Sequence, residues 1–263
     1  MRLVTNTITL ALTLGLAAIA VSSQMSEVKA AEPTTKPVIV LVHGAFADGS
    51  SWSHVIPLLE KDGYTVIAVQ NPLTSLADDT ATTKRVVDAQ KSPVVLVGHS
   101  YGGAVITGAA AGSANVKALV YIAAYAMEAK ENIGALNAKF APPALSTALA
   151  PDAAGFLYVD RVKFHDVFCA DVPAPEARIM AATQKPIAAS AFGDTVDTPA
   201  WKTIPSWYMV SQEDRAINPD LERFMAKRMN ATTTEIKASH VPFISHPKEV
   251  TQLIEQAATA TTK

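Results

Sequence analysis

The chain has very little cysteine and little charge. Its 263 residues include one cysteine, Cys169, which excludes an intramolecular disulfide and a cysteine-based metal cluster. We expect Cys169 to be a small buried residue. Charged residues make up 17% of the chain, and its formal net charge is −2. This net charge does not attract the protein to polyanions, so nucleic acid is not an expected partner. No histidines or carboxylates show metal-ligand spacing, so neither a metal nor a cofactor is expected.

The sequence also lacks an apolar run long enough to cross a bilayer. The longest run, residues 8–21, falls short of the roughly 20 residues that a transmembrane helix needs. Arg2 precedes this run and Val28-Lys29-Ala30 follows it, as in a secretory signal peptide cut after Ala30. We therefore expect a signal peptide at residues 1–30, a disordered leader at 31–36, and a secreted or periplasmic protein without stable membrane insertion. An uncleaved anchor is the alternative.

Apolar segments alternate with helical patterns over the rest of the chain. Such alternation is typical of an α/β fold, a mainly parallel sheet with helices on both faces, here expected over residues 37–263. The predicted strands are 38–42, 64–69, 93–97, 116–121, 206–210 and a more polar 235–238. The predicted helices are 51–61, 76–89, one directly after Ser100, one beginning at Pro219 and one beginning at Pro247.

The alternation stops between about residues 127 and 203. Seven prolines divide this stretch into short amphipathic segments, and it is too long for a plain loop. We interpret it as a small inserted cap that covers the ends of the strands where the nucleophile is expected.

The segment Gly98-His99-Ser100-Tyr101-Gly102 carries the strongest chemical signal. An apolar strand precedes it and a small-residue helix follows, as in the turn on which a hydrolase presents its nucleophilic serine. That turn is strained and leaves no room for side chains two residues before and after the serine. Ser100 is therefore the predicted nucleophile.

Serine needs a base and an acid that orients the base. Among six histidines, His240 follows the last predicted strand directly and is the predicted base, and we expect Pro242 to prevent a helix from starting at once. We expect His43 to shape its loop and His99 to pack. The acid follows the preceding strand as Asp214, with Glu213 as the alternative. The order Ser100, Asp214, His240 is that of the α/β-hydrolase arrangement.

An oxyanion needs two aligned N–H donors. We expect them to be the backbone N–H groups of Tyr101 and of Ala45, with Phe46 as the alternative to Ala45. The segment 43–50 lacks the lysine of a nucleotide loop, which argues against a phosphate site. Phe46 and Tyr125 are the expected lining of the substrate pocket.

The motifs at Leu41–Phe46, Ser51-Trp52, Gly98–Gly103, Asp214 and His240 together resemble those of the α/β-hydrolase superfamily. Within it, the chain from about residue 37 to 258 looks most similar to small esterases related to plant methylesterases and hydroxynitrile lyases. The resemblance implies cofactor-free ester hydrolysis through an acyl-serine intermediate, beneath a small helical cap.

Three positions depart from the patterns of these relatives. Lyases of this group carry a threonine at the position of Gly44 and a lysine at that of Val241. Plant methylesterases typically have a cysteine at the position of Phe46. We therefore expect a secreted serine hydrolase of small, fairly apolar esters; a lyase, or a receptor without catalysis on the same fold, is the alternative.

Overall fold

The computed structural model describes residues 36–261. The signal peptide predicted for residues 1–30, and all of the predicted leader except Lys36, therefore lie outside the described residues. Residues 36–261 belong to one compact unit.

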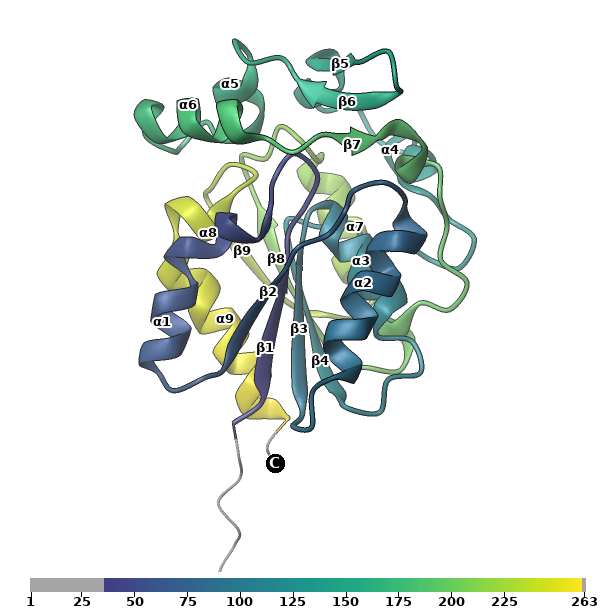
Figure 1. The fold of residues 1–263 in the computed structure, drawn as a ribbon, viewed down its shortest axis with the longest axis vertical. Coiled ribbons are helices and arrows are strands. Elements are labelled where there is room, and N and C mark those ends of the chain that lie inside the picture. Colours follow the sequence, from purple (N-terminus) through teal and green to yellow (C-terminus); the bar gives the residue numbers. More distant parts are fainter. Residues whose placement is uncertain (1–35, 262–263) are drawn as a thin grey trace, which may run out of the picture. The chain divides into compact units, whose positions relative to one another are not determined.

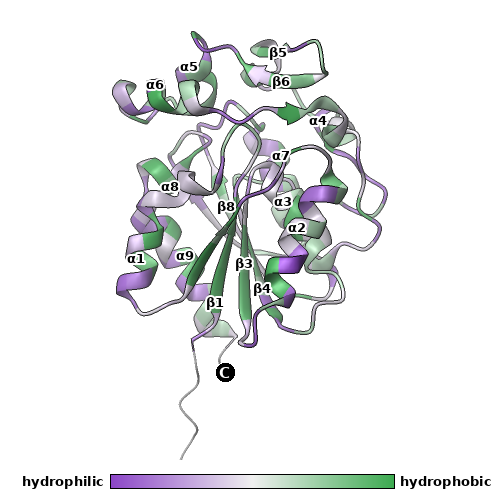
Figure 2. Ribbon diagram, in the orientation of Figure 1, coloured by the Kyte–Doolittle hydropathy of each residue, from purple (hydrophilic) through white to green (hydrophobic). Residues whose placement is uncertain are grey.

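A six-stranded parallel sheet forms the centre of this unit, in the order β2-β1-β3-β4-β8-β9 (Figure 1). The strands are β1 (Val38–Val42), β2 (Val66–Val69), β3 (Val94–His99), β4 (Val116–Ile122), β8 (Ser206–Ser211) and β9 (Thr232–Ile236). All residues of β1, β3 and β8 are buried, because helices cover both faces of the sheet. Figure 2 shows the resulting hydrophobic strands at the centre.

Helices α1 (Ile56–Lys61) and α9 (Pro247–Ala260) cover one face of the sheet. Helices α2 (Leu76–Asp88), α3 (Tyr101–Ala109) and α7 (Pro219–Arg228) cover the other. The predicted helix at 51–61 is two elements, a 3₁₀ helix η1 (Gly49–His54) followed by α1, in which Pro57 occupies the first turn where its missing N–H costs nothing.

Two predictions near His240 are wrong. The last strand lies at 232–236 and not at 235–238, because β9 is a largely exposed edge strand of threonines that gives no apolar signal. Pro242 does not prevent a helix after His240. It opens the short helix α8 (Pro242–Ser245), since proline is well suited to the first position of a helix.

The segment between β4 and β8 passes over the carboxyl ends of the strands (Figure 1). It contains α4 (Ile133–Asn137), α5 (Phe164–Phe168), α6 (Ala174–Thr183), the 3₁₀ helices η2 (Ala144–Thr147), η3 (Ala189–Phe192) and η4 (Ala200–Lys202), and a small antiparallel sheet of β5 (Leu149–Pro151), β6 (Phe156–Val159) and β7 (Ile187–Ala188). The resemblance implied a small helical cap; the inserted cap contains helices and also this small sheet, which was not predicted. We call residues 123–205 the cap.

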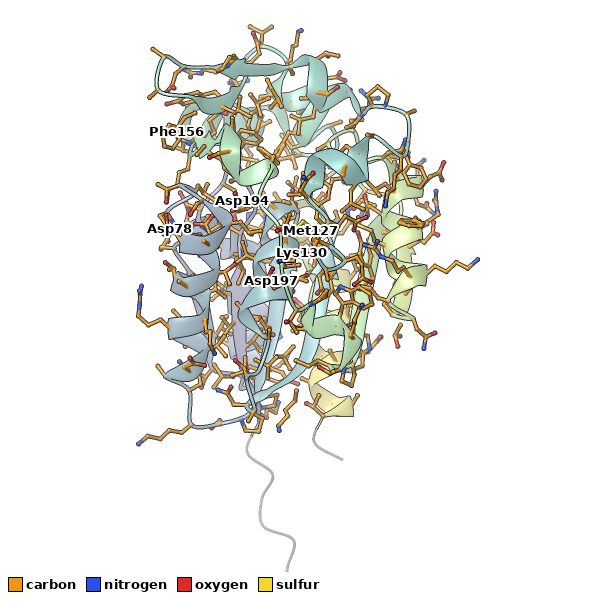
Figure 3. The ribbon with its side chains drawn as sticks, turned by 90° about the vertical axis from the view of Figure 1, so that its right-hand side faces the viewer. Asp78, Met127, Lys130, Phe156, Asp194 and Asp197 are labelled. Atoms are coloured by element: carbon orange, nitrogen blue, oxygen red, sulfur yellow. The ribbon has the colours of Figure 1, made fainter. Side chains whose placement is uncertain are left out.

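The two ends of the cap run side by side. The N–H of Lys130 donates to the carbonyl of Val196 at 2.8 Å, and the Lys130 ammonium pairs with Asp197. Figure 3 shows Lys130, Asp197 and Asp194 together on the side of α2 and α3. The cap is thus anchored where the chain leaves the sheet and where it returns.

Candidate active site

Ser100 occupies the sharp turn between β3 and α3. Its backbone has φ 53° and ψ −123°, a conformation that side chains rarely adopt and that costs on the order of 1–3 kcal/mol. Its N–H donates to Ile122 of β4, and its carbonyl accepts from Gly103 and Tyr125. These bonds to the neighbouring strand hold the strained turn in place.

The glycines on each side of Ser100 are required by close backbone contacts. A Cβ on Gly98 would lie 2.6 Å from the carbonyl oxygen of Gly102, and one on Gly102 would lie 2.6 Å from the carbonyl oxygens of Val42 and His43. The absence of side chains at these positions lets α3 start directly against the end of β1.

The loop after β8 brings Asp214 to His240. The Nδ1 of His240 lies 2.6 Å from Oδ2 of Asp214, and both side chains are almost fully buried. The other oxygen, Oδ1, accepts from the N–H groups of Ala216 at 2.6 Å and Ile217 at 2.9 Å. The alternative acid, Glu213, lies at the surface beside Lys237 at 3.6 Å. The structure therefore pairs Asp214, and not Glu213, with His240.

His240 presents its second nitrogen, Nε2, without a hydrogen-bond partner among residues 36–261. The ring rests edge-on against Phe168 of the cap, with ring centroids 5.0 Å apart. Its backbone carbonyl accepts from Nε2 of His99, the residue before Ser100, at 2.9 Å, and the His99 and His240 rings are 4.6 Å apart. His99 thus joins the loop of the predicted base to the turn of the predicted nucleophile.

His43 and His99 are themselves poor candidates for the base. Burial lowers the pKa of His43 to about 4, and burial lowers that of His99 well below its usual range. His43 makes two bonds within its loop region: Nδ1 donates to the Gly44 carbonyl and Nε2 accepts the N–H of Asn71. Both rings are therefore neutral and contribute to packing and loop shape.

The loop after β1 lies against Ser100. A Cβ on Gly44 would approach the Cβ of Ser100 to 2.8 Å. The N–H groups of Ala45, Phe46 and Tyr101 make no hydrogen bond to residues 36–261. The Tyr101 hydroxyl instead donates to Asp79 at 2.7 Å, so the tyrosine ring packs against α2 and only its backbone is available to the site.

Phe46 and Tyr125 line two different cavities beneath the cap. One, of about 230 Å³, is lined by Phe46 and Val241 together with Phe168 and Met180 of the cap. The other, of about 260 Å³, is apolar in most of its lining: Tyr125, Ile133, Leu145, Leu149, Leu157, Phe192 and Ala216 are among its residues. Neither lining includes Ser100, Asp214 or His240 themselves. The first cavity contains Val241, the residue after His240, and the second contains Tyr125, whose backbone N–H donates to the Ser100 carbonyl at 3.0 Å.

No sequence pattern indicated which cap residues line these cavities. Phe168, Leu145 and Phe192 come from a segment without a regular apolar period, so no pattern set them apart from other cap residues. Phe168 could have been suspected only as one of two closely spaced aromatic residues in an otherwise polar stretch, with Phe164 before it.

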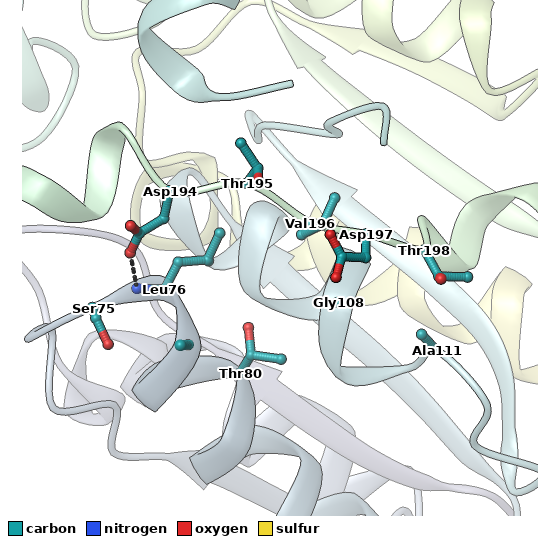
Figure 4. Close-up of a pocket in the computed structure, with 11 residues that line it drawn as sticks. Ser75, Leu76, Thr80, Gly108, Ala111, Asp194, Thr195, Val196, Asp197 and Thr198 are labelled. Atoms are coloured by element: carbon teal, nitrogen blue, oxygen red, sulfur yellow. Dashed lines mark hydrogen bonds between the residues drawn. The ribbon is translucent and has the colours of Figure 1, made fainter. Parts of the chain in front are cut away.

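A third cavity, of about 630 Å³, lies away from Ser100, between α2, the end of α3 and residues 194–198 (Figure 4). Its two carboxylates are already engaged: Asp194 accepts the N–H of Leu76 at 2.9 Å, and Asp197 pairs with Lys130. This cavity therefore adds no reactive group to the candidate site.

Three further observations bear on the site's chemistry. Cys169 is fully buried, and burial raises the pKa of its thiol to about 12, so it stays protonated. Across residues 36–261, no three histidine, cysteine or carboxylate side chains are grouped as a metal ion requires. None of the helices in this range has the length and hydrophobicity to traverse a membrane.

The sequence and the fold were compared with known proteins. A profile described as "Alpha/beta hydrolase family" matches residues 39–253. The pyrethroid hydrolase of Sphingobium wenxiniae is 28% identical over 257 residues, which cover 84% of this chain and 88% of that protein.

Two solved structures share the fold. Polyneuridine aldehyde esterase superposes with a TM-score of 0.73 at 17% identity, over 84% of this chain and 98% of its own. The methylesterase MES16 from Arabidopsis superposes with a TM-score of 0.70 at 16% identity, over 85% of this chain and 99% of its own. These likenesses confirm the fold class predicted from the sequence.

Proposed function

The chain belongs to the α/β hydrolase family, and from this premise we propose that it is a serine hydrolase of small, fairly apolar carboxylic esters. The observation that carries the proposal is the buried 2.6 Å contact between His240 and Asp214, beside a strained serine turn. Relatives named as a pyrethroid hydrolase and a methylesterase agree with ester chemistry.

In the proposed mechanism, Ser100 Oγ attacks the ester carbonyl while Nε2 of His240 takes the serine proton. Asp214 accepts the Nδ1–H, which fixes the tautomer with a free lone pair on Nε2 and stabilises the imidazolium that forms. The tetrahedral oxyanion is held by backbone N–H groups of Tyr101 and of Ala45, or of Phe46 in place of Ala45. His240 then protonates the departing alcohol, and water releases the acid from the acyl-serine by the same steps.

Two cavities beneath the cap, one of them mainly apolar, support an ester with a modest group on each side of the carbonyl. Together they offer about 490 Å³, since one measures about 230 Å³ and the other about 260 Å³. The cavity at Tyr125 is mostly apolar and favours a hydrophobic group, whereas the cavity at Phe46 also contains Asp48, Glu176 and serine hydroxyls.

The environment of His240 does not favour the lyase alternative. Val241, at the position where related lyases have lysine, is an entirely buried aliphatic residue. The nearby Lys237 is an exposed surface residue paired with Glu213. Neither provides a cation beside His240 for a departing cyanide. The export predicted from residues 1–30 stays a prediction.

The test is active-site labelling combined with turnover. We expect a fluorophosphonate to modify Ser100, located by mass spectrometry, and short 4-nitrophenyl esters to be hydrolysed. Ser100→Ala should abolish labelling and lower kcat/KM by on the order of 10⁴–10⁶.

Two results would contradict the proposal. Unlabelled Ser100 with no ester turnover in a folded protein would indicate a receptor. Cyanide release from mandelonitrile that equals or exceeds ester turnover would indicate a lyase.

A further inference from the structure

A second carboxyl group lies beside the Asp214–His240 pair. Glu222 of α7 is fully buried, and its Oε2 accepts the backbone N–H of Ser211, the last residue of β8, at 3.0 Å. Its other oxygen, Oε1, receives no hydrogen bond from an N–H or O–H group within residues 36–261. A buried carboxylate with one donor is poorly solvated, which is costly unless the group is neutral.

The carboxyl groups of Glu222 and Asp214 lie close enough to share a hydrogen bond if one of them carries a proton. Two ionised carboxylates cannot form such a bond, because neither has a proton to donate. Asp214 already accepts three hydrogen bonds, from Ala216, Ile217 and His240, which stabilise its negative charge. Glu222 accepts one. The shared proton therefore resides on Glu222.

The charges around Glu222 agree with this assignment. Burial, followed by the charge of Asp214, raises the pKa of Glu222 well above its usual range. The nearest cation, Arg223, pairs at the surface with Glu235 and Asp220. Tyr208 and Tyr125, the other titratable groups that interact with Glu222, have pKa values raised by their own burial and are neutral phenols.

We propose that Glu222 is a positioning residue that acts through Asp214: as a neutral carboxylic acid it accepts from Ser211 and donates to Asp214. The role rests on the function proposed for Ser100, Asp214 and His240. It fixes the rotamer of Asp214 and withdraws part of its charge. Less of the Asp214 charge then acts on His240, and we expect activity to extend to lower pH than it would with an unshielded Asp214.

The experiment compares Glu222→Gln, Glu222→Met and Met225→Ala in the full chain. Glutamine keeps an acceptor for Ser211 and a donor for Asp214, whereas methionine has a similar volume but no donor. Met225 is a buried residue of the same helix and controls for loosened packing of α7. The readouts are kcat and KM against pH for a short 4-nitrophenyl ester, and the melting temperature against pH.

We expect Glu222→Met to lower kcat about tenfold or more with little change in KM, and to move the acidic limb of the kcat/KM profile up by about half a pH unit. Glu222→Gln should keep kcat within about threefold and leave the limb in place. Met225→Ala should lower the melting temperature without moving the limb. If Glu222→Met moves only the melting temperature, or Glu222→Gln is as impaired as Glu222→Met, the proposal is wrong.

The melting temperature tests the proton on Glu222 without relying on activity. A carboxyl that stays protonated in the folded state loses its proton on unfolding above its ordinary pKa, so stability falls as pH rises from there toward the folded-state pKa. Glutamine does not titrate. The advantage of Glu222→Gln over the natural chain should therefore grow between pH 5 and 8. A constant or shrinking difference would show that Glu222 is ionised, whatever reaction the site performs.

Discussion

At the scale of single residues, the backbone of Ser100 is the most unusual feature of the site. Its φ of 53° is held by a hydrogen bond that its N–H donates to β4 and by one that its carbonyl accepts from the start of α3, which offset a local conformational cost. The site therefore stores backbone strain at the residue that is proposed to react.

Two separate substitutions of Ser100, by alanine and by glycine, measure this strain. Alanine keeps the strained backbone, whereas glycine adopts it readily. We expect Ser100→Gly to be more stable than Ser100→Ala by about 1 kcal/mol in urea unfolding, after allowing for the greater freedom of glycine in the unfolded chain. Equal stability, or a more stable alanine variant, would mean that the turn is unstrained. Both variants should be inactive if Ser100 is the nucleophile.

Much of the candidate site could be predicted at this scale, because nucleophile turns impose local sequence rules. Gly98 and Gly102 are dictated by contacts within 2.6 Å, and the positions of Asp214 and His240 after consecutive strands of the sheet follow from topology. Asp214 was preferred to Glu213 because it lies farther beyond the strand, but Glu213 stayed open as the alternative, because the choice depends on how the loop after β8 turns. Glu222 gave no signal, because a glutamate in an amphipathic helix ordinarily faces water.

At the scale of elements, the contact between α3 and β1 sets how closely the nucleophile turn approaches the loop of Ala45. Gly102 allows this contact, because a Cβ there would meet two backbone carbonyl oxygens that have little freedom to move. Gly108, later in the same helix, has no such restriction: its nearest neighbours are side-chain atoms of Thr80, at 3.2 Å or more.

These two glycines give a matched pair of substitutions. We expect Gly102→Ala to destabilise the protein by about 3 kcal/mol through overpacking and to impair activity by displacing Ser100. Gly108→Ala should lie within about 1 kcal/mol of the natural chain, since better helix propensity offsets the slight crowding. Urea unfolding monitored by circular dichroism measures both. Similar losses for the two variants would show that the cost reflects α3 in general rather than its contact with β1.

Elements were predictable where they are buried and regular. The strands β1, β3 and β8 are continuous apolar runs because both of their faces are covered. The edge strand β9 was misplaced because its exposed threonines carry no burial signal. The small sheet of the cap was missed because strands of two to four residues are too short to show a period.

At the scale of the whole described unit, His43 and His99 couple stability to pH. Both are buried: His43 begins the loop after β1, and His99 is the last residue of β3, directly before Ser100. Both have lowered pKa values, and that of His43 is about 4. In the unfolded chain each would bind a proton near pH 6.5, but in the folded protein each stays neutral. The unfolded state therefore binds more protons below pH 6.5, and acid favours unfolding.

We expect the free energy of unfolding to fall as the pH is lowered from about 6.5 toward 4, by up to about 1.4 kcal/mol per pH unit for each histidine. Glu222 and Asp79, whose pKa values are raised, act in the opposite direction above the ordinary carboxyl range and reduce the net slope.

His43→Gln removes one of the two histidine contributions. It should be less stable than the natural chain at pH 7.5, but should lose less stability between pH 6.5 and 5. Leu59→Ala leaves a cavity at a buried position of α1 without removing a titratable group. It should lower the free energy of unfolding by the same amount at pH 6.5 and at pH 5. Urea unfolding at several pH values tests this. If the curves of His43→Gln and the natural chain run parallel, His43 takes up no proton on unfolding and does not contribute to acid sensitivity.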